Sequence, residues 1–537
     1  MTYLQTIQRS ITNPEELELA YQQAIKSGAE KEFAEALETG YAQASDNLLL
    51  AAWHYRLLHA AARIKGRVIA WGWALPLGVL NGLLLWLLSD DERFRLEIVS
   101  PLTGATSYNL VPLVVLLTAP ISAALIALFL TLAGQRAWRR ALAGGLGLAA
   151  GAAYVLLLFP RLWPRVFQQQ YVGLMVLHLA LLAWAAAGIV ALARRADQAN
   201  RFAFLVKSLE AVVVGGLLAI AGGLFTVITF GLFDALGIQP PEVVMRLFAA
   251  GGGGLIVIVA AALVYDPRAT PLEQSFDEGL SKLVALLLRL LLPLTVGVLL
   301  VYLGFIPFNW RQPFENRDVL MIFNAMLFAV IALLMGATPV RQTDLGERAQ
   351  TWLRRGIIAL AALALLVSLY ALSAIIYRTV NDHLTPNRLL FSGWNVVNII
   401  ILAVLLIHQA RAGRSRWLPA MHRAFALGIA LYLIWSVVGV LVPPWLFRGD
   451  PGDVAGLPVS IQRIAFDQPP PILLKCPLSP HIYLLERGQK RWVKDIPTFE
   501  AQGYRWNDVA QYVTCEDLRS VPDGETIPPG SGPPPQP

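Results

Sequence analysis

Long apolar stretches alternate with short polar loops between residues 67 and 446, and this alternation constrains the fold more than any other feature of the chain. A bilayer has a hydrocarbon core about 30 Å thick, so each crossing needs about 20 residues of helix. A segment in lipid has no water to satisfy its backbone, which excludes open strands and leaves the α-helix. The predicted spans are 67–89, 110–134, 141–159, 171–193, 209–231, 245–265, 281–304, 319–337, 355–377, 393–409 and 424–446. We therefore predict an all-α polytopic membrane protein with about eleven transmembrane helices.

The composition agrees with this prediction. Hydrophobic residues make up 56% of the chain and charged residues 15%, which excludes a soluble enzyme, a nucleic-acid-binding domain and a disordered scaffold as descriptions of the whole chain. The net charge of +7 would suggest a nucleic-acid partner in a soluble protein. In a membrane protein the basic residues instead mark one side of the bilayer, so no nucleic-acid partner is predicted.

The basic residues predict the orientation. One set of alternate connections holds 21 Lys and Arg residues and the other set holds eight. Positive residues are retained on the cytoplasmic side, so the N-terminus is predicted to be cytoplasmic. An odd number of spans then places the C-terminus outside the membrane. The predicted location is an inner or plasma membrane.

Residues 1–66 are polar and helix-forming, and they lack the basic start and apolar run of a cleaved signal peptide. Helices are predicted at 14–26, 30–43 and 46–65, with Asn13 and Pro14 at the first start and Asp46 as a cap of the third. Their apolar stripes predict a small cytoplasmic helical hairpin. A docking platform similar to a single helical-repeat unit is the alternative.

The last part of the chain divides into a proline-rich linker at 447–472, a small α+β domain at 473–527 and a disordered tail at 528–537. Residues 481–485 and 490–493 predict two strands around a turn, followed by short helices near 497–502 and 506–511. Cys476 and Cys515 bracket this unit. Outside the membrane such a pair is oxidised, so a disulfide is predicted, with two free thiols as the alternative.

The familiar catalytic signatures are missing from the sequence. It has no Gly-Lys-Ser/Thr phosphate loop, no His-Glu-x-x-His metal pair and no strand-borne dinucleotide fingerprint. No catalytic residue, metal ligand or cofactor is therefore predicted. The glycine pairs of span five and the run Gly251–Gly254 lie in apolar helices, where they favour close helix packing, with a locally unwound helix as the alternative.

Arg289 and Glu210 are the clearest intramembrane charges. An uncompensated charge in hydrocarbon is costly, and the two residues have similar predicted depths. We expect a structural ion pair between them. The alternatives are an Arg289 that snorkels to the interface, or an anion-binding site for a substrate or a lipid headgroup.

Uncharged polar residues inside the spans are expected to hold helices together. His178 is interpreted as a neutral histidine bonded to a neighbouring helix, with a ligand or proton relay as the alternative. Asn324, Asn395 and Asn398 are interpreted as interhelical hydrogen-bonding residues, with a polar permeation path as the alternative.

Two sets of loops carry carboxylates. The cytoplasmic loop contains Asp266, Glu273, Asp277 and Glu278, without a spacing that singles out a metal. The outer loops contain Glu315, Arg317 and Asp318, then Asp382, His383 and Arg388. Solvated loops are the favoured interpretation of both, and a transferase acting on a lipid-linked donor would use the outer groups.

The middle of the chain resembles the bacterial multipass membrane family called domain of unknown function 4153. The resemblance rests on Leu205–Glu210, Gly222–Phe225, Leu232–Ile238, Leu291–Leu294 and Val301–Leu303. It implies an all-helical polytopic fold and no activity. The chain as a whole also resembles proteins of filamentous Chloroflexota bacteria.

The C-terminal domain is similar to a short Trp/Tyr-rich module of exported bacterial proteins. The matching positions are Ile482–Leu484, Lys490–Val493, Phe499, Gly503–Trp506, Asp508–Val509 and Pro522–Gly524. This resemblance implies an exported location and surface contacts rather than catalysis.

Taken together, the sequence favours a non-enzymatic subunit or scaffold that joins protein partners at both ends and contacts membrane lipid. The first alternative is a transporter or channel for a small or lipid-linked anionic substrate. The second is a membrane transferase acting on a lipid-linked substrate.

Overall fold

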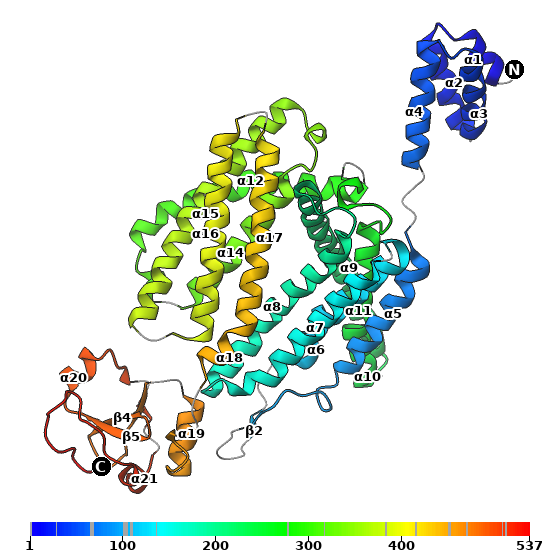
Figure 1. Cartoon of the computed structure of the whole chain (residues 1–537). Coiled ribbons are helices and arrows are strands. Elements are labelled where there is room, and N and C mark those ends of the chain that lie inside the picture. The colour runs from blue at the N-terminus through cyan, green and yellow to red at the C-terminus, as the bar shows by residue number, and fades with distance from the viewer. Residues whose placement is uncertain are drawn as a thin grey trace. The chain divides into compact units, whose positions relative to one another are not determined.

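The computed structural model describes residues 3–27, 29–64, 69–99, 106–107, 111–135, 137–276, 279–315, 317–381, 384–413, 416–448, 453–468, 471–506, 509–510 and 513–537. The chain forms two separately packed units, Met1–Ile69 and Ala70–Pro537 (Figure 1).

The first unit is a cluster of short helices. They are α1 (Tyr3–Arg9), α2 (Pro14–Ser27), α3 (Glu30–Gln43) and α4 (Leu48–Ile64). The unit has its own core, formed by Ile7, Leu17, Ala20, Ala24, Phe33, Leu37, Leu50 and Trp53. The Asn13 side chain accepts from the first amides of α2, as predicted. Asn47, rather than the predicted Asp46, does the same for α4.

The second unit is dominated by a bundle of long apolar helices. Among the described residues, ten helices are long and apolar enough to cross a membrane. The bundle helices are α5 (Trp71–Leu88), α6 (Leu113–Leu130), α7 (Trp138–Leu158), α8 (Arg165–Ala191), α9 (Gln198–Ala235), α10 (Glu242–Arg246) continued by α11 (Gly252–Val264), α12 (Gly279–Phe305), α14 (Arg317–Ala337), α15 (Glu347–Asn381), α16 (Pro386–Ala412) and α17 (Trp417–Leu441). The structure is thus mostly helical, and its ten candidate membrane-spanning helices agree with the predicted multipass fold.

The predicted eighth span corresponds to α14, which differs from the other bundle helices. Its described apolar part is Ile322–Ala337, shorter than the ten long helices. It nevertheless packs in the main core, where Leu327 and Leu334 are fully buried. The prediction of eleven membrane crossings depends on α14. The number of crossings, and the location of the C-terminus derived from it, therefore remain predictions.

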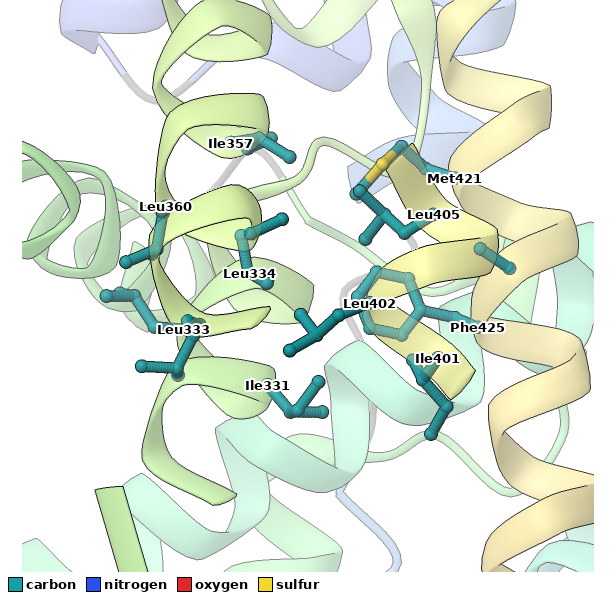
Figure 2. Packing of buried hydrophobic residues seen from close by; sticks show 14 of the residues in the cluster. Ile331, Leu333, Leu334, Ile357, Leu360, Ile401, Leu402, Leu405, Met421 and Phe425 are labelled. Atoms are coloured by element: carbon teal, nitrogen blue, oxygen red, sulfur yellow. The ribbon is translucent and has the colours of Figure 1, made fainter. Parts of the chain in front are cut away.

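The main core lies among α9, α12, α14, α15, α16 and α17. Figure 2 shows Leu333 and Leu334 of α14, Leu360 of α15 and Leu402 of α16 pointing into one apolar cluster. A second core joins α6, α7, α8 and α17 through residues such as Val155, Tyr171 and Met175. Apolar packing within these two cores therefore holds the helices together.

The connections of the bundle gather at its two ends. At one end Arg194 donates to Arg268 O at 2.6 Å, and Arg341 donates to Leu272 O at 2.8 Å. This is the predicted cytoplasmic end. At the other, predicted outer end, Trp86 donates to Val243 O at 3.1 Å. There Tyr154 also donates to Leu441 O at 2.7 Å.

Short elements complete the predicted outer end. The strands β1 (Ile98–Val99) and β2 (Thr106–Ser107) pair antiparallel. The short helices are α13 (Gln312–Glu315) and α18 (Pro443–Leu446).

The C-terminal part is a small α+β domain with a four-stranded sheet of order β5-β4-β3-β6. Its elements are α19 (Val459–Asp467), β3 (Ile472–Leu474), β4 (Ile482–Glu486), β5 (Gln489–Val493), α20 (Ile496–Ala501), β6 (Val509–Ala510) and α21 (Cys515–Ser520). Neighbouring strands are antiparallel except β3 and β6. The predicted hairpin of β4 and β5 and the Cys476–Cys515 disulfide are both present.

Three features of this domain differ from the prediction. The segment 506–511, predicted as a helix, contains strand β6 in its described part. The segment 447–472, predicted as a linker, contains α19 and the start of β3, because Ile461, Ile464 and Ile472 bury apolar side chains in the domain core. The tail is also tied down, since Tyr483 donates to Pro535 O at 2.6 Å and Arg519 to Pro537 O at 3.0 Å.

Candidate functional site between helices α6, α8, α9 and α11

A cavity of about 570 Å³ lies between α6, α8, α9 and α11. Its walls are almost entirely apolar. They are built from small residues, since ten of the lining residues are alanine and three are glycine. Small side chains leave space between helices that larger ones would fill, which explains why this part of the bundle is hollow.

The polar side chains at the predicted cytoplasmic end of the cavity are Lys207, Ser208 and Tyr265. Lys207 is only 2% exposed, and its Nζ lies 2.7 Å from Glu210 Oε2. Ser281 of α12 completes the group: its hydroxyl accepts from Lys207 Nζ at 3.0 Å and donates to Glu210 Oε1 at 2.6 Å. The charged pair is thus neutralised within the protein and linked to a second helix.

The predicted pairing of Glu210 with Arg289 is corrected by this arrangement. Arg289 is half-buried and donates from Nε to Ala337 O at 3.2 Å, at the end of α14. Glu210 has its cation on its own helix, three residues earlier. Residues at i and i+3 lie on the same helix face, so the pair forms locally. The anion-binding alternative for Arg289 remains a prediction.

The local sequence explains why Lys207 lies inside the bundle. Helix α9 begins at Gln198 rather than near residue 209, and Asp197 accepts from Asn200 N at 3.0 Å as its N-cap. That hydrogen bond holds the pKa of Asp197 below its usual value. With the helix starting so early, Lys207 is nine residues inside it. The ring of Phe276 also lies 4.7 Å from Lys207 Nζ.

Tyr265 follows α11 directly and lines the predicted cytoplasmic end of the cavity. It is 8% exposed, and its hydroxyl is buried without a hydrogen-bond partner among the described residues. Ser208, by contrast, accepts from Trp184 Nε1 at 2.9 Å. The Tyr265 hydroxyl therefore remains available to an acceptor inside the cavity.

A second polar group lies deeper in the bundle, beside Ser122. The Asn81 amide of α5 donates to Ser122 Oγ at 2.9 Å and to Gly254 O at 2.8 Å. Close approach of α5 and α11 makes these bonds possible, because a Cβ on Gly254 would lie 2.9 Å from Gly82 Cα. The close packing predicted for the glycine run thus applies to Gly254. Nothing lies within 4 Å of such an atom at Gly252 or Gly253.

His178 and the three asparagines lie outside this cavity. His178 Nδ1 is 2.8 Å from Leu174 O, and its Nε2 accepts from Trp394 Nε1 at 3.2 Å. These two contacts define a neutral imidazole with its proton on Nδ1. The arrangement agrees with the predicted bond to a neighbouring helix and joins α8 to α16.

Asn324, Asn395 and Asn398 are all buried. Asn398 accepts from the Tyr432 hydroxyl of α17, which is the interhelical bond predicted for it. Both amide atoms of Asn395 lack a hydrogen-bond partner among the described residues. The three side chains come from α14 and α16, and none of them lines the cavity.

The loop predicted to be cytoplasmic forms a hydrogen-bonded turn over its described residues. Thr270 N donates to Glu273 Oε2 at 2.9 Å, and this bond lowers the pKa of Glu273. Asp266 N donates to Gln274 Oε1 at 2.9 Å. The predicted loop residues Asp277, Glu278, Asp382 and His383 lie outside the described residues, as do the side chains of Glu315, Arg317 and Asp318. The part of the chain that the structure describes contains no group of three His, Cys, Asp or Glu residues placed to hold a metal ion.

No protein-family model, curated protein or solved structure matches this chain.

Proposed function

We propose that the chain is a non-enzymatic subunit or scaffold of a bacterial cell membrane that joins a partner on the cytoplasmic side to a partner outside. The proposal includes two resemblances. The middle of the chain resembles the domain of unknown function 4153 family, and its C-terminal domain resembles an exported module. Membrane lipid surrounds the bundle in this account, and protein partners contact both ends.

The observation that carries the proposal is a set of contacts between the end of α8 and the start of the C-terminal domain. Arg165, at the start of α8, lies 3.3 Å from Asp467 Oδ1, at the end of α19. The Trp163 and Phe466 rings are 5.0 Å apart, and Trp163 N donates to Phe447 O at 3.1 Å. These contacts would attach the domain to the helix ends, as a mounted binding platform requires.

The surfaces of the two end units suit partner binding. In the C-terminal domain Leu478 is 91% exposed, and Ile496 and Trp506 are also exposed. In the N-terminal unit Leu48 is 87% exposed, although the unit has a core of its own. These positions are therefore where contact with a protein partner can be tested.

Site-specific photo-crosslinking in the native membrane tests this function. A photoreactive amino acid is placed at Leu48, at Leu478 and, as a control, at Leu224 of α9, which is 61% exposed on an apolar helix. The proposal predicts a protein adduct of defined mass at each of the first two positions and none at Leu224. If neither Leu48 nor Leu478 yields a protein adduct, the scaffold function is refuted.

The cavity between α6, α8, α9 and α11 favours a second candidate, a transporter of a lipid-linked anionic substrate. Its apolar walls suit the chain of a lipid-linked substrate. Reconstitution into vesicles with a fluorescent lipid analogue separates the candidates, because a pure scaffold does not speed its movement between leaflets.

A further inference from the structure

The cavity between α6, α8, α9 and α11 has the dimensions of a lipid chain. Along α6 it extends from Ala119 to Leu130. With a rise of 1.5 Å per residue this distance is about 16 Å, close to half the roughly 30 Å hydrocarbon core. The volume of about 570 Å³ also lies within the range of ligand sites. One chain of one leaflet therefore matches the space.

The chemistry of the walls excludes a water-filled chamber. Apart from Ser122, whose hydroxyl is bonded to Asn81, the polar lining side chains are those at the predicted cytoplasmic end. Apolar cavities remain dry, because a water molecule inside needs two or more polar partners. An apolar occupant is the chemically matched one, and the surrounding bilayer supplies it.

The predicted cytoplasmic end of the cavity suits a polar headgroup. The Tyr265 hydroxyl is buried, lines the cavity and has no hydrogen-bond partner among the described residues. Arg194 lies three residues after the lining residue Ala191, and it donates to Arg268 O. The carboxylates of Asp266 and Glu273 lie on the same loop, and each accepts a hydrogen bond from a backbone amide of that loop, from Arg268 N and Thr270 N respectively. A hydrogen-bond acceptor on an anionic headgroup would meet a donor and a positive charge here.

We propose that this cavity binds one acyl chain of a glycerophospholipid, with an ester or phosphate oxygen accepting a hydrogen bond from Tyr265. The site goes beyond the scaffold function and does not depend on it. It makes the lipid an integral part of the bundle, filling the space that the alanine and glycine residues leave between α9 and its neighbours.

Two glycines that line the cavity can be replaced by a larger residue, so that its side chain occupies the cavity without a clash. Gly216 of α9 and Gly253, next to the start of α11, line the cavity, and a Cβ at either would meet nothing within 4 Å. Gly223 of α9 is equally open but does not line the cavity, so Gly223→Leu is the matched control. Tyr265→Phe removes only the hydroxyl.

Native mass spectrometry of the delipidated full chain, titrated with palmitoyl-oleoyl phosphatidylglycerol, tests the proposal. We expect one tightly retained lipid in the wild type and in Gly223→Leu, and at least a tenfold loss of affinity in Gly216→Leu and Gly253→Leu. Tyr265→Phe should weaken binding roughly two- to tenfold, the effect of one hydrogen bond. Equal retention in all variants would overturn the site, as would palmitate binding as tightly as the phospholipid.

Quenching of tryptophan fluorescence gives a second test that does not use the glycine variants, whose folding could be impaired. Trp184 lines the cavity. A phosphatidylglycerol with a brominated chain should therefore quench the wild type more than Trp184→Phe, by the contribution of this one tryptophan. Equal quenching of the two proteins would show that the chain does not enter the cavity.

Discussion

Lys207 and Glu210 form an ion pair of 2.7 Å on one face of α9, and both side chains are almost fully buried. Ser281 bridges the two charges from α12, so the pair fastens two helices together. Two buried charges are tolerated here because each has a partner of opposite sign and a further hydrogen bond.

Removing one charge of this pair should destabilise the protein strongly. Glu210→Leu leaves the Lys207 ammonium uncompensated in the bundle, which costs about 3–5 kcal/mol. The double variant Lys207→Met, Glu210→Leu removes both charges and should recover most of that loss. Thermal unfolding in one detergent measures the effect. Equal destabilisation in the single and double variants would contradict the role assigned to the pair.

Phe466 should hold the C-terminal domain against the bundle. It is 4% exposed and packs in the core that contains Phe167 and Tyr171 of α8. Phe466→Ala should cost about 3–5 kcal/mol at this junction and release the domain. Limited proteolysis between α18 and α19 should become faster. The control Leu478→Ala changes a side chain that is 91% exposed and should leave the rate unchanged.

The Cys476–Cys515 disulfide should contribute much of the stability of the C-terminal domain. The two residues are 39 positions apart, and a loop of this length predicts roughly 4 kcal/mol of stabilisation. Replacing both cysteines by serine should lower the urea concentration at which the domain becomes sensitive to protease. A midpoint that does not change would refute this contribution.

Acid should loosen the predicted cytoplasmic loops. The pKa values of Asp197 and Glu273 are held low by backbone N–H bonds. Their stabilising effect is therefore present above the unfolded pKa values near 4 and is lost as pH falls through the lower folded values. Asp197→Asn with Glu273→Gln keeps the hydrogen-bond acceptors and removes the titration. Between pH 6 and pH 3, the unfolding temperature should fall less in this variant than in the wild type.

The local chemistry of the sequence predicted the apolar helices, the Asn13 cap, the β4–β5 hairpin and the disulfide, because each depends on residues close in sequence or on a single pair of cysteines. The partner of Glu210 was missed because the predicted fifth span begins at residue 209 and leaves Lys207 outside it. The Asp197 cap starts α9 early enough to place Lys207 inside the helix. If the early start of α9 is recognised, the spacing of Lys207 and Glu210 predicts an i,i+3 ion pair.

Other parts of the site depend on three-dimensional packing. The Asn81, Ser122 and Gly254 contact joins three helices, and nothing in the spacing of these residues reveals which helices are neighbours. The cavity likewise results from alanine and glycine side chains on four helices that meet only in the folded bundle. The segment before β3 was predicted as a linker because it is rich in proline, although it also carries the apolar stripe of α19.

We predict that the N-terminal unit and the C-terminal domain lie on opposite faces of the membrane. Cysteine labelling tests it directly, using Leu48→Cys in the N-terminal unit and Glu500→Cys in the C-terminal domain, because both positions are exposed. An impermeant maleimide applied to intact cells should label Glu500→Cys at once and Leu48→Cys only after permeabilisation. Labelling of both positions from the same side would mean an even number of crossings and would contradict a scaffold that joins the two faces.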